Sequence, residues 1–115
     1  MTIKELIDSG LFKTINVGDD TDRNISGLFC CDLLSIAMGR APAGCAWVTV
    51  MANMNTLAVA SLTECACVIL CHNVSIDENM KLKAVSENMN VLRTAKPIFT
   101  TALEVYKKLH ENPDL

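Results

Sequence analysis

Five polar or ionisable residues follow directly after short apolar runs of the sequence, where strands would end. They are Asp32, Asn53, Asn55, His72 and Thr94. If the apolar runs form parallel strands, these residues meet at the carboxyl edge of one sheet, where open α/β sheets bind their ligands. Helix N-termini that open onto the same edge would add backbone N–H donors and a field that favours negative charge. The sequence therefore predicts a binding site for an anionic or polar metabolite at this edge.

The same five residues also have a purely structural explanation. Asp32, Asn55 and Thr94 are of the types that cap helices, and His72 suits a turn. Every doubly wound domain has such an edge, so the residue types alone do not decide between a ligand site and a set of caps. The negative Asp32 would compete with an anionic ligand, and we therefore expect Asn55 and His72 to be the main anchors.

An acidic loop precedes the first of these residues. Asp19, Asp20 and Asp22 could bind a cation through their oxygens, but the loop lacks the glycine and the closing glutamate of an EF-hand. A solvated turn is therefore favoured, with Arg23 as the local ion-pair partner of the aspartates. In the alternative interpretation, Arg23 holds an anionic ligand, and the Asp22–Arg23 loop acts as a lid over the carboxyl edge.

Six cysteines occur in the chain, and three of them lie close together as Cys65-x-Cys67-x-x-x-Cys71. No C-x-x-C pair occurs, although such pairs are the usual unit of zinc and iron–sulfur sites. The spacing therefore favours reduced thiols in a core without metal. Cys67 and Cys71 would share one face of a strand, and Cys65 would join them if the strand begins early. A redox or iron–sulfur accessory protein that uses these cysteines stays open as an alternative.

Motifs of the common nucleotide-dependent and hydrolytic enzymes are missing from the sequence. There is no Walker-type G-x-x-x-x-G-K-[ST] loop, no G-x-G-x-x-G and no G-x-S-x-G. His72 and His110 lie on different predicted elements. No residue spacing in the sequence indicates that a nucleophile, a base and an orienting group come together. We therefore expect no catalytic residue and no cofactor. A small enzyme that uses His72 as an acid or base is the alternative.

Hydrophobic periodicity places the candidate residues on alternating strands and helices. The predicted strands cover 12–17, 27–31, 46–50, 67–71 and 91–93. The predicted helices begin at a capping box of Thr2 and Glu5, at Asp32, at 56, at a second capping box of Ser75 and Glu78, and at 96 or 97. Such alternation with short connections predicts a three-layer α/β/α sandwich around a mostly parallel sheet of about five strands.

Composition and charge limit the partners and the location. The chain has 115 residues, a formal net charge of -3 and a pI near 5.2, which argues against a nucleic-acid surface. Polar residues interrupt the stretch 41–76 too often for a membrane span, and no secretory signal opens the chain. We therefore expect a cytoplasmic protein that forms a single domain over residues 1–115. The helix at 56–62 has no charged side chain, and we expect another layer of the domain or a second subunit to bury it on both sides. Because the domain is too small to bury every such face, we predict a homodimer.

Three segments of the chain resemble the DRTGG domain family, and the likeness runs from Met1 to about Leu109. They are Asp22-Arg23-x-x-Ser26-Gly27-Leu-Phe-Cys-Cys-Asp32-Leu-Leu-Ser35, Ala46-Trp-Val-Thr-Val50 and Leu57-Ala-Val-Ala-Ser-Leu-Thr-Glu64. The chain is most similar to the short stand-alone members, although Asn24 and Ile25 stand where the family name has Thr-Gly-Gly. The resemblance implies a fold similar to the N-terminal domain of HPr kinase/phosphorylase. It also implies a regulatory or ligand-sensing module that often assembles as dimers or larger oligomers.

Together, the residues and the resemblance predict a non-catalytic, homodimeric regulatory domain. Its ligand would be a small nucleotide-like or anionic metabolite, or a protein partner, and neither nucleic acid nor a membrane is expected. The candidate ligand-binding residues are Asp32, Asn53, Asn55, His72, Thr94 and Arg23.

Overall fold

The computed structural model describes residues 1–111, which form five strands and five helices. The strands are β1 (Lys13–Asn16), β2 (Gly27–Cys30), β3 (Cys45–Thr49), β4 (Cys67–Leu70) and β5 (Val91–Arg93). The helices are α1 (Ile3–Asp8), α2 (Leu34–Arg40), α3 (Met54–Leu62), α4 (Glu78–Ser86) and α5 (Ile98–Leu109). This alternation confirms the predicted α/β class.

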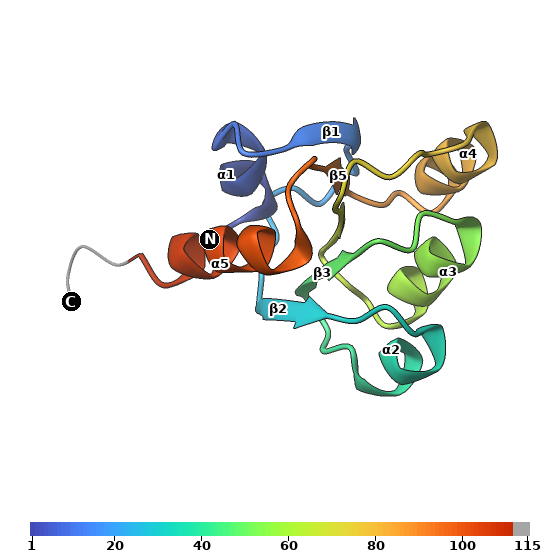
Figure 1. The fold of residues 1–115 in the computed structure, drawn as a ribbon, viewed down its shortest axis with the longest axis horizontal. Coiled ribbons are helices and arrows are strands. Elements are labelled where there is room, and N and C mark those ends of the chain that lie inside the picture. Colours follow the sequence, from blue (N-terminus) through green and yellow to red (C-terminus); the bar gives the residue numbers. More distant parts are fainter. Residues whose placement is uncertain (112–115) are drawn as a thin grey trace.

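All five strands belong to one sheet with the order β1-β5-β4-β3-β2. Strands β2 to β5 run parallel, and β1 pairs with β5 in the antiparallel direction at one edge. Helices α2, α3 and α4 cover one face of the sheet, and α1 and α5 cover the other (Figure 1). The predicted three-layer sandwich with a mostly parallel sheet is therefore confirmed.

The central strands are buried on both faces because each face packs against a layer of helices. Along β3, Cys45 and Trp47 face α2, α3 and α4, whereas Ala46 and Val48 face α1 and α5. Trp47 is fully buried, and its indole N–H donates to the Cys31 carbonyl at 2.9 Å. That bond satisfies the polar atom that burial of a tryptophan would otherwise leave unpaired.

The first helix begins and ends as its sequence predicts. Thr2 caps α1 by accepting from the Glu5 N–H at 3.1 Å, and the Glu5 carboxylate accepts from the Thr2 N–H at 3.2 Å. Gly10 follows the helix with φ +76°, a left-handed conformation that costs glycine little.

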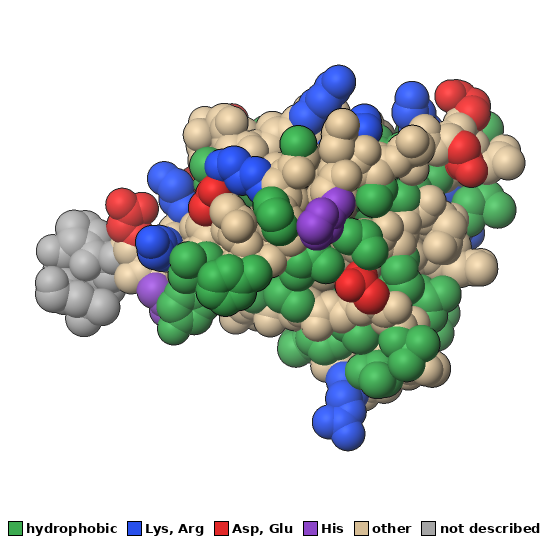
Figure 2. All heavy atoms as spheres, viewed as in Figure 1, with side chains coloured by type: hydrophobic (Ala, Val, Ile, Leu, Met, Phe, Trp, Pro, Cys, Tyr) green, Lys and Arg blue, Asp and Glu red, His purple; other side chains and the backbone are tan. Residues whose placement is uncertain are grey.

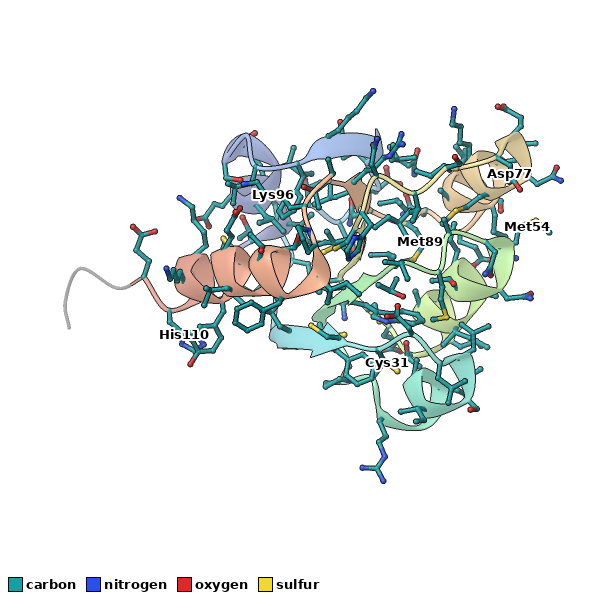
Figure 3. All side chains as sticks on the ribbon, in the orientation of Figure 1. Cys31, Met54, Asp77, Met89, Lys96 and His110 are labelled. Atoms are coloured by element: carbon teal, nitrogen blue, oxygen red, sulfur yellow. The ribbon has the colours of Figure 1, made fainter. Side chains whose placement is uncertain are left out.

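The predicted starts of α2, α3 and α4 are wrong. Helix α3 begins at Met54 with Asn53 as its cap, and not at 56. Asp77 and not Ser75 caps helix α4, and the Asp77 carboxylate accepts from the Met80 N–H at 2.8 Å (Figure 3). Helix α2 has Leu33 at its N-cap without a side-chain hydrogen bond, so Asp32 is not its cap. At α4 the sequence offers two acceptor side chains two positions apart, and Asp77 is the one that caps. At α2 the Asp32 carboxylate accepts from Thr49 and Val50 instead of capping the helix.

The uncharged helix α3 obtains its cover inside the chain. It lies between α2 and α4 (Figure 1), and Thr56, Leu57, Val59 and Ala60 are buried. Leu62 at its end is 71% exposed. The cover of this helix therefore comes from the same domain and leaves its ends exposed, and its composition no longer demands a second subunit.

The cysteines are split between the two faces of the sheet. Cys67 and Cys71 face α1 and α5, as predicted, whereas Cys65 packs with Cys45 on the face of α2, α3 and α4. Cys65 would join Cys67 and Cys71 only in a strand that begins early, but β4 begins at Cys67, so Cys65 does not follow its alternation.

Within residues 1–111, no helix combines the length and apolar character that crossing a membrane requires.

Candidate functional site

The carboxyl ends of β2, β3, β4 and β5 lie at one edge of the sheet, because these four strands are parallel. Asp32 follows β2, Asn53 and Asn55 follow β3, His72 follows β4, and Thr94 follows β5. The structure thus places all five of these predicted residues along the same edge. Their side chains nevertheless differ in what they contact.

Asp32 ties the ends of two neighbouring strands together. Its carboxylate accepts from the Thr49 hydroxyl at 2.6 Å and from the Val50 N–H at 2.9 Å. Both bonds join the loop after β2 to the end of β3. One Asp32 oxygen therefore already has two donors, and the negative charge disfavours an anionic ligand at this end of the edge.

Asn53 and Asn55 lie at the start of α3 but have different roles. The Asn53 side chain caps the helix by accepting from the Thr56 N–H at 3.1 Å. Asn55 lies inside the first turn and is exposed, so it is not the cap. Both side chains are exposed, but the Asn53 Oδ1 already accepts from Thr56, whereas the Asn55 side chain has no hydrogen bond among the described residues.

The loops after β4 and β5 are joined through their backbones. His72 and Asn73 have left-handed φ values of +58° and +54°. Their N–H groups donate to the carbonyls of Lys96 and Thr94, both at 3.0 Å. The His72 side chain is exposed, whereas Thr94 is buried and its hydroxyl accepts from the Lys96 N–H at 3.2 Å. Thr94 therefore has a structural role in ordering the loop.

Arg23 lies at the opposite, amino edge of the sheet. One guanidinium nitrogen donates to the Glu64 carbonyl at 2.7 Å, and another lies 3.8 Å from the Asp20 carboxylate. The predicted ion pair with the acidic loop is thus present. The Asp22–Arg23 loop precedes β2, so it lies at the beginning of the strand, and the prediction that it forms a lid over the carboxyl edge is wrong.

A groove of about 410 Å³ lies at the carboxyl edge beside β1 and β5, and we call it the β1–β5 groove. It is lined by Gly10, Leu11, Phe12, Lys13, Asn73, Arg93, Thr94 and Ala95. Of the five predicted edge residues, only Thr94 lines it. The groove therefore shifts the candidate site away from Asp32 and α3, towards the edge strand.

Two cations face each other at this groove. Lys13 and Arg93 are direct partners in the antiparallel pairing of β1 and β5. One Arg93 guanidinium nitrogen donates to the Asn73 carbonyl at 3.2 Å, but the buried Arg93 Nε has no hydrogen-bond partner among the described residues. Like charges directly opposite each other in a sheet are destabilising, and an unpaired buried donor adds to the cost.

A third cation adjoins the pair on the side of α4. Lys13 and Arg93 also line a second groove of about 290 Å³, to which α4 contributes Lys81. Lys and Arg side chains gather above β1 and towards α4 at the top of the space-filling view (Figure 2). We call these three residues the Lys13–Lys81–Arg93 cluster.

Most other cations of the chain have an acidic partner. Lys4, Arg23, Lys83, Lys96 and Lys108 each lie within 4.0 Å of a carboxylate oxygen. Among residues 1–111, no member of the Lys13–Lys81–Arg93 cluster has such a partner. The cluster is therefore a concentration of uncompensated positive charge in a chain whose formal net charge is -3.

The sequence signals for this cluster were incomplete. Arg93 closes a predicted strand, so its position at the carboxyl edge follows from the sequence pattern. Lys13 lies on an edge strand, where lysine usually discourages pairing with other chains. Its position opposite Arg93 depends on the antiparallel register, which the sequence does not encode locally.

No three His, Cys, Asp or Glu side chains of the described residues converge in a way that could hold a metal ion.

No protein-family model and no curated protein matches the sequence. The fold resembles a crystal structure of the CBS and DRTGG domains from the regulatory region of Clostridium perfringens pyrophosphatase, complexed with its activator diadenosine tetraphosphate. The TM-score is 0.75 at 11% sequence identity, and the match covers 94% of this chain. It covers 46% of that chain, so the present sequence spans about half the length of the solved structure. The likeness establishes a fold of the CBS/DRTGG kind, and membership of the DRTGG family stays a prediction.

Proposed function

We propose that this chain is a non-catalytic regulatory domain that binds an anionic, phosphate-bearing small molecule in the β1–β5 groove. The observation that carries the proposal is the direct pairing of Lys13 with Arg93 at the groove. A phosphate group between the two side chains would replace repulsion by two attractive contacts. It would also offer an acceptor to the unpaired Arg93 Nε.

Arginine is well suited to this role. Its planar guanidinium binds phosphate oxygens in a bidentate manner, and Lys13 adds a flexible point charge. The groove volume of about 410 Å³ lies in the range of small-molecule sites, which is about 300–1,000 Å³. The neighbouring groove with Lys81 offers room for a second phosphate of the same ligand.

The comparison with the pyrophosphatase regulatory region supports a regulatory role. That region was crystallised with diadenosine tetraphosphate, a polyanionic nucleotide. Its chain contains CBS domains in addition to the DRTGG domain, so the present proposal rests on the Lys13–Lys81–Arg93 cluster for the location of the ligand. A nucleotide with several phosphates is the class of ligand that the cluster would favour.

Asn55 and His72 remain candidates for a second part of the site. His72 is exposed and adjoins Asn73, whose carbonyl accepts from Arg93 at 3.2 Å. A ligand that is anchored by its phosphates at Arg93 would reach His72 first and Asn55 afterwards, along the carboxyl edge. Asp32 lies at the far end of that edge, beside β3, and we assign it no ligand contact.

The experiment is a calorimetric titration of the chain with diadenosine tetraphosphate, ATP and inorganic tripolyphosphate. We expect binding of at least one of them, weakened at least about tenfold in Arg93→Gln and Lys13→Gln, since charge-assisted phosphate contacts contribute about 1.5–3 kcal/mol each. Arg40→Gln is the matched control, because Arg40 is an exposed cation at the end of α2.

The three outcomes separate the parts of the proposal. Binding that is lost in Arg93→Gln and kept in Arg40→Gln supports the groove. Binding that is kept in Arg93→Gln but lost in a His72→Ala and Asn55→Ala double variant would mean that the ligand binds in the middle of the carboxyl edge and not in the β1–β5 groove. If none of the three polyphosphates binds at millimolar concentration, the proposal is wrong.

A further inference from the structure

Two buried cysteines from separate segments lie in direct contact at the amino edge of the sheet. The Cys45 and Cys65 Sγ atoms are 3.5 Å apart. Cys45 opens β3, and Cys65 ends the turn that joins α3 to β4. Backbone hydrogen bonds hold this arrangement, because the Ala66 N–H donates to the Cys45 carbonyl at 2.8 Å and the Cys65 N–H donates to the Ala60 carbonyl at 2.9 Å.

We propose that Cys45 and Cys65 are a dithiol site that a small hydroperoxide oxidises to an intramolecular disulfide. Cys65 is the attacking thiol, and Cys45 is the resolving thiol. The site is independent of the proposed anion groove, which lies at the opposite edge of the sheet.

The surroundings of the two thiols distinguish their roles. The Cys45 and Cys65 thiols share a hydrogen bond, and the Thr63 hydroxyl lies 3.3 Å from the Cys65 sulfur. The hydrogen bonds with Cys45 and Thr63 and the positive charge of Arg23 lower the pKa of Cys65 to about 7, despite the opposing effect of burial. The hydrogen bond to Cys65 and burial raise the pKa of Cys45. Cys65 is therefore the thiol that carries the negative charge required for attack.

Arg23 is held in place for this role. Its guanidinium donates to the carbonyl of Glu64, the residue directly before Cys65, at 2.7 Å. Asp20, Glu64 and Glu87 contribute carboxylates to the same cleft, and the Asp20 carboxylate lies 3.8 Å from Arg23. The positive charge nearest the Cys65 turn is thus fixed by both backbone and side-chain contacts.

A small oxidant has a route to Cys65. A cleft of about 300 Å³ at the amino edge is lined by Arg23, Glu64, Cys65 and Asn90, among others. Hydrogen peroxide is about the size of two water molecules, each of which takes roughly 30 Å³. Cys67 has no comparable position, because it is fully buried on the other face and burial raises its pKa to about 12.

The chemistry balances with hydroperoxide as the only co-reactant. The Cys65 thiolate attacks the terminal peroxide oxygen, the O–O bond breaks, and the leaving hydroxide or alkoxide takes up a proton. Cys65 is then a sulfenic acid. The Cys45 sulfur attacks the Cys65 sulfur, the S–O bond breaks, and water leaves with the proton from Cys45. The two sulfurs, now 3.5 Å apart, close to a bond of about 2.05 Å.

The test treats the reduced, full-length chain with an equimolar amount of hydrogen peroxide and locates the products by mass spectrometry. Trypsin is unsuitable, because no Lys or Arg lies between Arg40 and Lys81 and both cysteines stay on one peptide. Glutamyl endopeptidase cleaves after Glu64, which separates Cys45 from Cys65. We expect a cross-linked pair of peptides that has lost two hydrogens, with the link at Cys45 and Cys65.

The controls make the outcome decisive. Cys67→Ser should keep the cross-link, whereas Cys65→Ser should abolish it and slow peroxide consumption at least about tenfold. Cys45→Ser should stop at the sulfenic acid on Cys65, which dimedone traps. In the unmodified protein, thiols that stay unchanged after treatment with peroxide, or oxidation confined to the exposed Cys30, would overturn the proposal.

Discussion

The Asp32 carboxylate accepts from the Thr49 hydroxyl at 2.6 Å and from the Val50 N–H at 2.9 Å, and so joins the ends of β2 and β3. An aspartate that follows a strand in an α/β sheet suggests a ligand site. Here the contacts give it a structural role, because Thr49 is fully buried and its hydroxyl has no access to water.

Replacement of Asp32 should therefore destabilise the fold and leave ligand binding unchanged. We expect Asp32→Ala to lower the free energy of unfolding by about 1–3 kcal/mol, because it leaves the Thr49 hydroxyl and the Val50 N–H without acceptors. Urea denaturation followed by circular dichroism measures this change. Thr49→Val is the matched variant, and a double-mutant cycle should show that the two losses are not additive. Two independent, additive losses would contradict the contact.

The reactivity of Cys65 should depend on pH in a way that differs from the other thiols. Hydrogen bonds with Cys45 and Thr63 and the charge of Arg23 lower its pKa to about 7, whereas burial and Asp32 raise the pKa of the exposed Cys30. Iodoacetamide labelling at Cys65 should thus rise through about pH 7, and labelling at Cys30 should rise only at more alkaline pH. Arg23→Gln should move the Cys65 midpoint upwards. A Cys65 midpoint above that of Cys30 would contradict this ordering.

The same shift has a consequence for stability. A thiol whose pKa is lowered on folding stabilises the fold above its unfolded pKa, and this contribution is lost as the pH falls through the folded pKa. The free energy of unfolding should therefore rise from about pH 7 towards pH 9. Cys65→Ala should flatten the rise. An equally steep rise in that variant would mean that groups other than Cys65 cause the pH dependence.

A homodimer is expected through the outer face of α5. Phe99, Leu103 and Tyr106 lie on one stripe of this helix and are 77%, 40% and 53% exposed. Apolar side chains gather over α5 in the space-filling view (Figure 2), next to the edge strand β2. Burial of such a stripe against a second copy would remove large apolar side chains from water.

Light scattering at micromolar concentration should thus give the mass of two chains. Phe99→Glu together with Leu103→Glu should give one chain, because a charge at the centre of an apolar contact is costly. Leu82→Glu on α4 is the matched control, since Leu82 is 60% exposed on another helix. A monomer in the unmodified protein would contradict the dimer.

The sequence predicted the architecture because strand burial leaves a clear pattern. The apolar run of β4 and the β-branched residues of β3 are typical of strands covered on both faces. Local competition explains the errors at helix starts, where Ser75 and Asp77 are both acceptable caps. Tertiary hydrogen bonds to Thr49 removed Asp32 from the capping role that its residue type suggests.

The candidate site was only partly predictable for a topological reason. Residues after parallel strands were correctly placed at the carboxyl edge, whereas Arg23 precedes β2 and so lies at the amino edge. Lys13 reaches Arg93 through antiparallel pairing across almost the whole length of the chain. Cys45 and Cys65 meet across 20 positions through two neighbouring strands. Such contacts depend on register and strand order, which no local pattern encodes.

A titration followed by nuclear magnetic resonance can locate an anion bound between Lys13 and Arg93. Diadenosine tetraphosphate is added to isotope-labelled protein, and the shifts of the backbone amides and of the Arg93 Nε–H signal are recorded. We expect the largest changes at Lys13, Arg93 and Thr94, with a marked shift of the Arg93 Nε–H signal. Changes confined to the amino edge around Arg23 and Glu64, or to Asp32 and α3, would contradict it.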